Sequence, residues 1–88
     1  PVTEDSNEPF VVHVDREGRY FLNDNQDPVT QLNEIRVTAA AVLRNRPETQ
    51  FLVRGDRNVS YDAVVQAMVL LQKAGVSSVG LVTDSSGS

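Results

Sequence analysis

Four polar side chains that could bind a ligand lie close together in the second half of the sequence. They are Arg54, Asp56, Arg57 and Tyr61, between an expected strand and an expected helix. Open α/β sheets tend to bind ligands at the carboxyl ends of their strands, so this position suits recognition. From the residues alone, a strand-to-helix loop held by an Arg–Asp pair is favoured over a ligand site.

Patterns typical of catalysis or metal binding are absent from the sequence. Cysteine is absent, and the one histidine, His13, lies between two valines. A transition-metal site needs more ligands of these types, and Asp24, Asn25 and Asp27 lack the glycine and glutamate of a calcium-binding loop. Ser60 lacks a nucleophile turn and a base, and its place before a helix explains it as a cap. We therefore expect no enzyme activity, no metal and no cofactor.

The composition is typical of one small globular domain. The chain has 88 residues, of which 40% are hydrophobic and 23% are charged. This length can bury one core, and this balance argues against disorder of the whole chain. The formal net charge of −4 argues against nucleic acid and anionic lipid as partners. No apolar run approaches the roughly 20 residues that a membrane-spanning helix needs.

The first half of the sequence predicts a hairpin followed by a helix. Residues 10–14 form a β-branched segment with Phe10, Val12 and Val14 on one face, and a glycine-containing connector joins it to residues 19–22. Apolar residues then recur at helical spacing from a start within residues 30–33. Pro47 ends this helix, because a residue before proline leaves the helical region.

The second half predicts a strand at residues 50–54, a helix after Ser60 that ends at Gly75, and a strand at residues 79–82. The order β-β-α-β-α-β favours an α/β (α+β) fold, with a small mixed sheet and two helices packed on one face. The other sheet face and an edge strand would stay open, which favours self-association. We expect the dimer interface at the last strand, at Val79, Leu81, Val82 and Thr83.

The stretch from residue 51 to residue 83 resembles the periplasmic domain of the TolR/ExbD family. The family pattern is a strand with a glycine and a charged residue, a V-x-Y-[DE] step, a helix ending L-x-x-A-G and a strand containing V-G-L. The matching segments are FLVRGD at 51–56, VSYD at 59–62, LQKAG at 71–75 and SVGLV at 78–82. Residues 74–81 favour the TolR branch, whereas Arg54 and Asp56 resemble the ExbD form. The resemblance spans residues 10–83 and is strongest after Pro47.

This resemblance implies a mechanical role. TolR-like proteins have one transmembrane helix and act as homodimers with TolQ-like proteins in a stator driven by the proton-motive force, which energises TolA-like proteins. This system maintains the outer membrane and its constriction at cell division. TolR periplasmic domains bind peptidoglycan, and the resemblance makes Arg54, Asp56, Arg57 and Tyr61 candidate contacts, because arginine makes paired hydrogen bonds to carboxylates and sugars need polar partners. An ExbD-like subunit would instead energise TonB-dependent import. A small-molecule-binding regulatory domain is the alternative outside the family.

The resemblance also implies how the chain is organised. We expect a flexible linker from a missing transmembrane anchor at residues 1–9, the periplasmic domain at residues 10–83, and a flexible tail at residues 84–88. Because the chain begins at Pro1 and not at methionine, we interpret it as a piece of a longer protein. The expected location is the inner membrane of a Gram-negative bacterium, with this domain in the periplasm.

Overall fold

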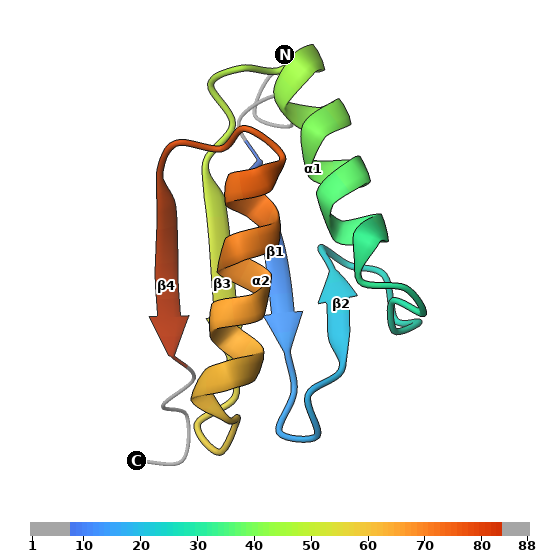
Figure 1. Cartoon of the computed structure of the whole chain (residues 1–88), viewed down its shortest axis with the longest axis vertical. Helices are drawn as coiled ribbons and strands as arrows, with labels where there is room; N and C mark the ends of the chain where they lie inside the picture. The colour runs from blue at the N-terminus through green and yellow to red at the C-terminus, as the bar shows by residue number, and fades with distance from the viewer. Residues whose placement is uncertain (1–7, 84–88) are drawn as a thin grey trace.

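Two helices pack on one face of a four-stranded sheet (Figure 1). The computed structural model describes residues 8–83, so the expectations for residues 1–7 and 84–88 lie outside the described part. The elements in chain order are β1 (Phe10–Val14), β2 (Tyr20–Leu22), α1 (Asn33–Asn45), β3 (Phe51–Gly55), α2 (Tyr61–Lys73) and β4 (Val79–Thr83). The expected β-β-α-β-α-β order and the α+β class are confirmed.

The sheet has the strand order β2-β1-β3-β4. The tight connection after β1 makes β2 antiparallel to it. The connection through α1 leads from β2 to β3, which pairs parallel with β1, and the crossover through α2 places β4 parallel to β3, so β1, β3 and β4 all run the same way. The outer edge of β2 is partly covered, because the Val29 N–H donates to the Tyr20 carbonyl at 2.7 Å. Within residues 8–83, β4 bonds only to β3, and its outer edge is bare.

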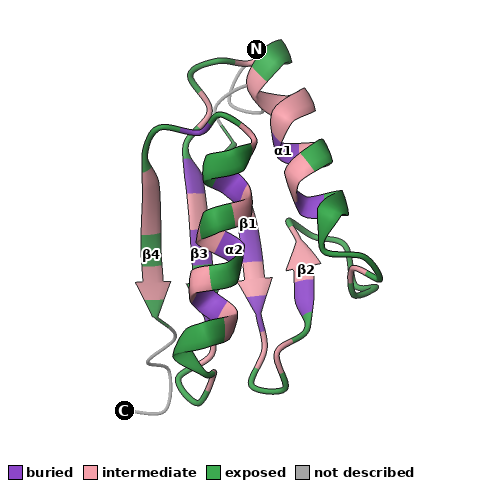
Figure 2. Ribbon diagram, in the orientation of Figure 1, coloured by how far each residue is buried: buried purple, intermediate pink, exposed green. Residues whose placement is uncertain are grey.

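The core lies between the sheet and the helices, and alternation along the strands produces it. In β1 every second residue points toward the helices and is buried, while the residues between them are half-buried (Figure 2). The rings of Phe10 and Phe51 meet edge to face, with centroids 5.4 Å apart and planes at 64°. The buried apolar residues are Phe10, Val12, Val14, Tyr20, Ile35, Ala39, Phe51, Val53, Val64, Ala67, Leu71 and Val76.

The ends of α2 follow local sequence signals. Ser60 has extended backbone angles, and its Oγ accepts a hydrogen bond from the Ala63 N–H at 3.2 Å, which makes it the expected cap. Gly75 follows the helix at φ +106°, a conformation that side-chain-bearing residues rarely adopt. α1 begins at Asn33, within the expected range. Unlike Ser60 at the start of α2, Leu32 at the cap position of α1 forms no side-chain hydrogen bond.

The sheet face turned away from both helices is uncovered, as expected. We call it the open face. Its apolar members are half-buried and not sealed, and Arg54 is exposed. By register and alternation its residues are Val11, His13, Phe21, Leu52, Arg54, Gly80 and Val82.

Candidate functional site

The structure divides the four polar residues expected to form one site. Arg54 lies on the open face, in a depression of about 140 Å³ whose lining includes His13, Phe21 and Asp56. Arg57 and Tyr61 lie on the helix side, in a depression of about 190 Å³ beside β4. Asp56 lines both. The strand explains the division, because Arg54 points away from the helices and the chain turns toward α2 only after Gly55.

An aspartate turn, and not an Arg–Asp pair, holds the loop between β3 and α2. The Asn58 N–H donates to Asp56 Oδ1 at 2.8 Å, and the Val59 N–H donates to the Asp56 carbonyl at 3.0 Å. Neither Arg54 nor Arg57 forms an ion pair with Asp56 in the described part of the chain. Both guanidinium groups are therefore available to a ligand.

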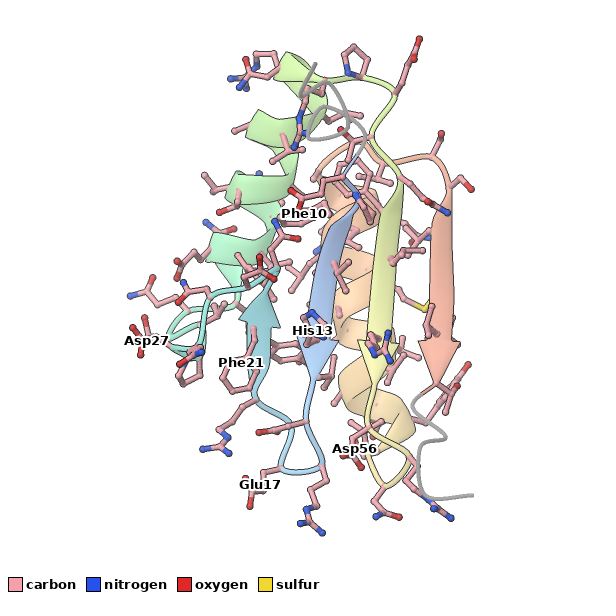
Figure 3. All side chains as sticks on the ribbon, turned by 180° about the vertical axis from the view of Figure 1, so that it is seen from behind. Phe10, His13, Glu17, Phe21, Asp27 and Asp56 are labelled. Atoms are coloured by element: carbon pink, nitrogen blue, oxygen red, sulfur yellow. The ribbon has the colours of Figure 1, made fainter. Side chains whose placement is uncertain are left out.

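His13 lies next to Arg54 across the parallel β1–β3 ladder and next to Phe21 across the β1–β2 ladder. Figure 3 views this face and shows His13 and Phe21 on neighbouring strands, with Asp56 beyond the end of β3. Burial lowers the pKa of His13 below its ordinary 6.5, and the positive charge of Arg54 lowers it further, while Asp24 acts in the opposite direction. The imidazole is therefore neutral at pH 7.

Sequence reasoning missed this neighbour of Arg54. In the sequence His13 is a lone histidine between two valines, which is typical of a surface or packing residue. Alternation along each strand indicates that His13 and Arg54 both face outward, and this was the available signal. The pairing of these two residues depends on the register between β1 and β3, which no local pattern in the sequence specifies.

The depression beside β4 is mostly apolar. Val59, Val64 and Leu81 line it together with Tyr61. Because α2 lies over β3 and β1 (Figure 1), it leaves Leu81 53% exposed although this residue faces the helix side. Of the four residues expected at a dimer interface, Val82 lies on the open face, and the helix side carries Val79, Leu81 and Thr83. A partner at this edge could contact both faces of β4.

A wider depression of about 450 Å³ lies between β2 and α2, and two of its polar side chains, Arg19 and Tyr20, are already engaged. Arg19 pairs with Asp15 at 2.7 Å and with Glu17 at 2.8 Å. The hydroxyl of Tyr20 donates to the Ala63 carbonyl at 2.7 Å. The cation of this surface is therefore already paired, whereas Arg54 and Arg57 form no ion pair within residues 8–83.

Residues 8–83, the part that the structure describes, contain neither a metal site nor a membrane-spanning helix. No cluster of three histidine, aspartate or glutamate side chains there could hold a metal ion. In the same range, both helices are too short or too polar to cross a membrane.

Comparison with known proteins gives one consistent family. The family model described as "Biopolymer transport protein ExbD/TolR" matches residues 2–86. The Tol-Pal system protein TolR of Escherichia coli K12 is 37% identical over 84 residues, covering 93% of this chain and 59% of the relative. TolR of Pseudomonas aeruginosa is 33% identical over 89 residues, covering 92% and 61%. TolR of Haemophilus influenzae is 32% identical over 85 residues, covering 94% and 61%.

The chain thus spans about three-fifths of the length of these curated relatives. The match extends over nearly all of its own residues, including both candidate surfaces. The chain belongs to the ExbD/TolR family of biopolymer transport proteins.

Proposed function

We propose that this chain is the periplasmic domain of a TolR-like stator subunit in the proton-motive-force-driven Tol-Pal system. The observation that carries the proposal is the match to relatives named TolR, at 32–37% identity over more than nine-tenths of the chain. The whole subunit would cross the inner membrane of a Gram-negative bacterium once. It would work with TolQ-like and TolA-like partners to maintain the outer membrane and its constriction at division.

A chimera tests this proposal. The 88 residues would replace the periplasmic domain of Escherichia coli TolR in a strain that lacks its own TolR. Restored detergent resistance and normal cell separation are expected, and a chimera without any periplasmic domain is the control. A matching ExbD chimera that restores TonB-dependent iron uptake, while the TolR chimera stays inactive, would instead support the ExbD-like alternative.

The subunit would act as a homodimer, with the bare edge of β4 as the contact. An unpaired strand edge presents a row of N–H and C=O groups that a second strand can bond. The exposed Leu81 adds apolar surface beside this edge. Sedimentation of the chain over a concentration series should show a monomer–dimer equilibrium.

The domain would also bind peptidoglycan, which carries sugars and peptides with free carboxylates. Arg54, Asp56, Arg57 and Tyr61 supply the polar and aromatic groups that such a ligand needs. The assay is co-sedimentation of the chain with purified sacculi. Binding that survives the combined Arg54→Ala and Arg57→Ala change would remove these residues from the site.

A small-molecule sensor with its site at Arg54 or Tyr61 is disfavoured by the size of the depressions around these residues. The two depressions have volumes of about 140 and 190 Å³. Pockets for drug-sized ligands hold about 300–1,000 Å³ and enclose most of the ligand. Surfaces of this kind are better suited to one end of a larger molecule. A thermal-shift screen with amino acids and nucleotides should therefore show no stabilisation.

A further inference from the structure

A continuous row of four side chains crosses the open face. Phe21 of β2, His13 of β1, Arg54 of β3 and Val82 of β4 are neighbours in register. Arg54 is the cation of this row, and an apolar side chain lies at each end. Such a surface combines one charge with apolar walls, which is the pattern by which proteins orient a ligand with a single charged group.

The two arginines beside Phe21 differ in their bonding. The guanidinium of Arg19 lies 6.0 Å from the Phe21 ring centroid, but Asp15 and Glu17 already neutralise it. Arg54 has no carboxylate partner within residues 8–83. The positive charge available on this face is therefore that of Arg54.

Asp15 and Asp56, the carboxylates that line the depression around Arg54, accept hydrogen bonds within their own turns. Asp15 accepts bonds from the Glu17 and Arg19 backbone at 3.0 and 2.8 Å, in addition to its ion pair with Arg19. Asp56 accepts the Asn58 N–H. Both line the depression around Arg54 without pairing with it. A ligand carboxylate would supply the acceptor that the chain itself does not.

We infer that the open face binds the free carboxylate of a short peptide, with Arg54 as the cation, His13 as the hydrogen-bonding neighbour and Phe21 as an apolar wall. The inference rests on the proposed peptidoglycan binding and assigns the peptide carboxylates of that polymer to this face. Glu8 and Asp24 line the adjoining depression beside His13, so a group with several negative charges would be repelled. A single carboxylate suits this balance better than a phosphate or an anionic membrane.

Binding should be coupled to the protonation of His13. The charged groups around this histidine are Arg54 on β3, Asp15 and Asp56 at the strand ends, and Asp24 and Glu8 on the other side. A bound carboxylate adds a negative charge next to the imidazole and raises its pKa. By linkage, the peptide then binds more tightly as the pH falls from 7 toward 6.

The test is an NMR titration of the 88-residue chain with N-acetyl-D-alanyl-D-alanine and with the C-terminal amide of the same peptide. The acid should shift the amide signals of His13, Phe21 and Arg54, and should raise the His13 pKa. The amide should bind about tenfold more weakly or not at all, because it lacks the charge. Equal affinity for acid and amide would overturn the inference.

Arg54→Gln should weaken binding of the acid by about tenfold or more, and Arg54→Lys should retain part of it, since it keeps the charge but loses the paired donors. Arg44→Gln is the matched control, because Arg44 is an exposed arginine on α1, away from the sheet. The inference fails if Arg54→Gln binds like the wild type, or if Arg44→Gln loses as much affinity.

Sacculus sedimentation separates this inference from the proposed function. Wild-type chain that binds sacculi, with Arg54→Gln binding much less, supports both. Sacculus binding that Arg54→Gln leaves unchanged overturns the open-face site and leaves peptidoglycan binding intact. Carboxylate binding in the titration without any sacculus binding supports the site but removes peptidoglycan as its source of peptides.

Discussion

The Tyr20 hydroxyl donates a 2.7 Å hydrogen bond to the Ala63 carbonyl, across 43 positions of sequence. It joins the hairpin to the first turn of α2. Tyr20 is buried, and this burial raises the pKa of its hydroxyl above 10.0. The phenol therefore remains a hydrogen-bond donor at all physiological pH values.

Tyr20→Phe should lower the free energy of unfolding by about 1 kcal/mol, because it deletes this bond and leaves the ring packing. Chemical denaturation measures the loss. Tyr61→Phe is the control, since Tyr61 is 77% exposed and should change stability by less than about 0.5 kcal/mol. Equal effects of the two changes would contradict the assigned bond.

Ser60→Ala should cost about 1 kcal/mol of stability, because the Ala63 N–H loses its acceptor at the start of α2. Ser77→Ala, at an exposed position between α2 and β4, should be nearly neutral. Thermal unfolding of both variants tests the prediction. A neutral Ser60→Ala would show that water replaces the cap.

Gly75→Ala should destabilise the domain by about 1–2 kcal/mol, because φ +106° is strained for any residue with a Cβ. The added Cβ would lie 3.4 Å from Leu43 Cδ2, an ordinary contact, so the loss would come from the backbone. Gly75→Asn should lose less, since asparagine tolerates positive φ better. Urea denaturation of the pair distinguishes strain from crowding.

Stability should fall as the pH drops below about 6.5, the ordinary pKa of histidine. The pKa of His13 is lowered in the fold, so at such pH values the unfolded chain binds the proton more readily, and protonation favours unfolding. The loss should continue until the pH has passed below the folded pKa. His13→Gln removes this titrating group, so the urea midpoint of the variant should change less with pH between 7.5 and 5.5. If the urea midpoint of the variant depends on pH as strongly as that of the wild type, another titrating group causes the loss of stability.

Leu81→Lys should weaken self-association by about tenfold or more, because it places a charge beside the bare edge of β4. Val37→Lys is a matched control on α1, since Val37 is 51% exposed and Leu81 is 53% exposed. Sedimentation equilibrium of both variants measures the effect. If the two lysine variants dimerise equally, the contact lies away from β4.

Much of the fold could be predicted because its signals are local. Alternation in β1, the Ser60 cap and the conformation of Gly75 each depend on a few neighbouring residues, and each prediction is confirmed. The ends of β2, β3 and β4 differ by one residue from the predicted ends, and α1 begins at Asn33, within the expected range.

The candidate site was less predictable, because it depends on contacts between distant segments. Arg54 and Tyr61 are close in sequence, yet the sheet places them on opposite sides. His13 joins Arg54 only through the β1–β3 register. The Arg–Asp pair offered as an alternative does not form within residues 8–83, where Asp56 Oδ1 accepts the Asn58 N–H.

The parallel arrangement of β1, β3 and β4 has a consequence for load. The described chain enters the sheet at the start of β1 and leaves it at the end of β4, at opposite ends of the domain (Figure 1). A pull between these two points slides the strands past one another and stretches both ladders along their whole length at once. Rupture in this shear geometry breaks many hydrogen bonds together and not one after another. A domain with this strand arrangement can transmit tension between the start of β1 and the end of β4.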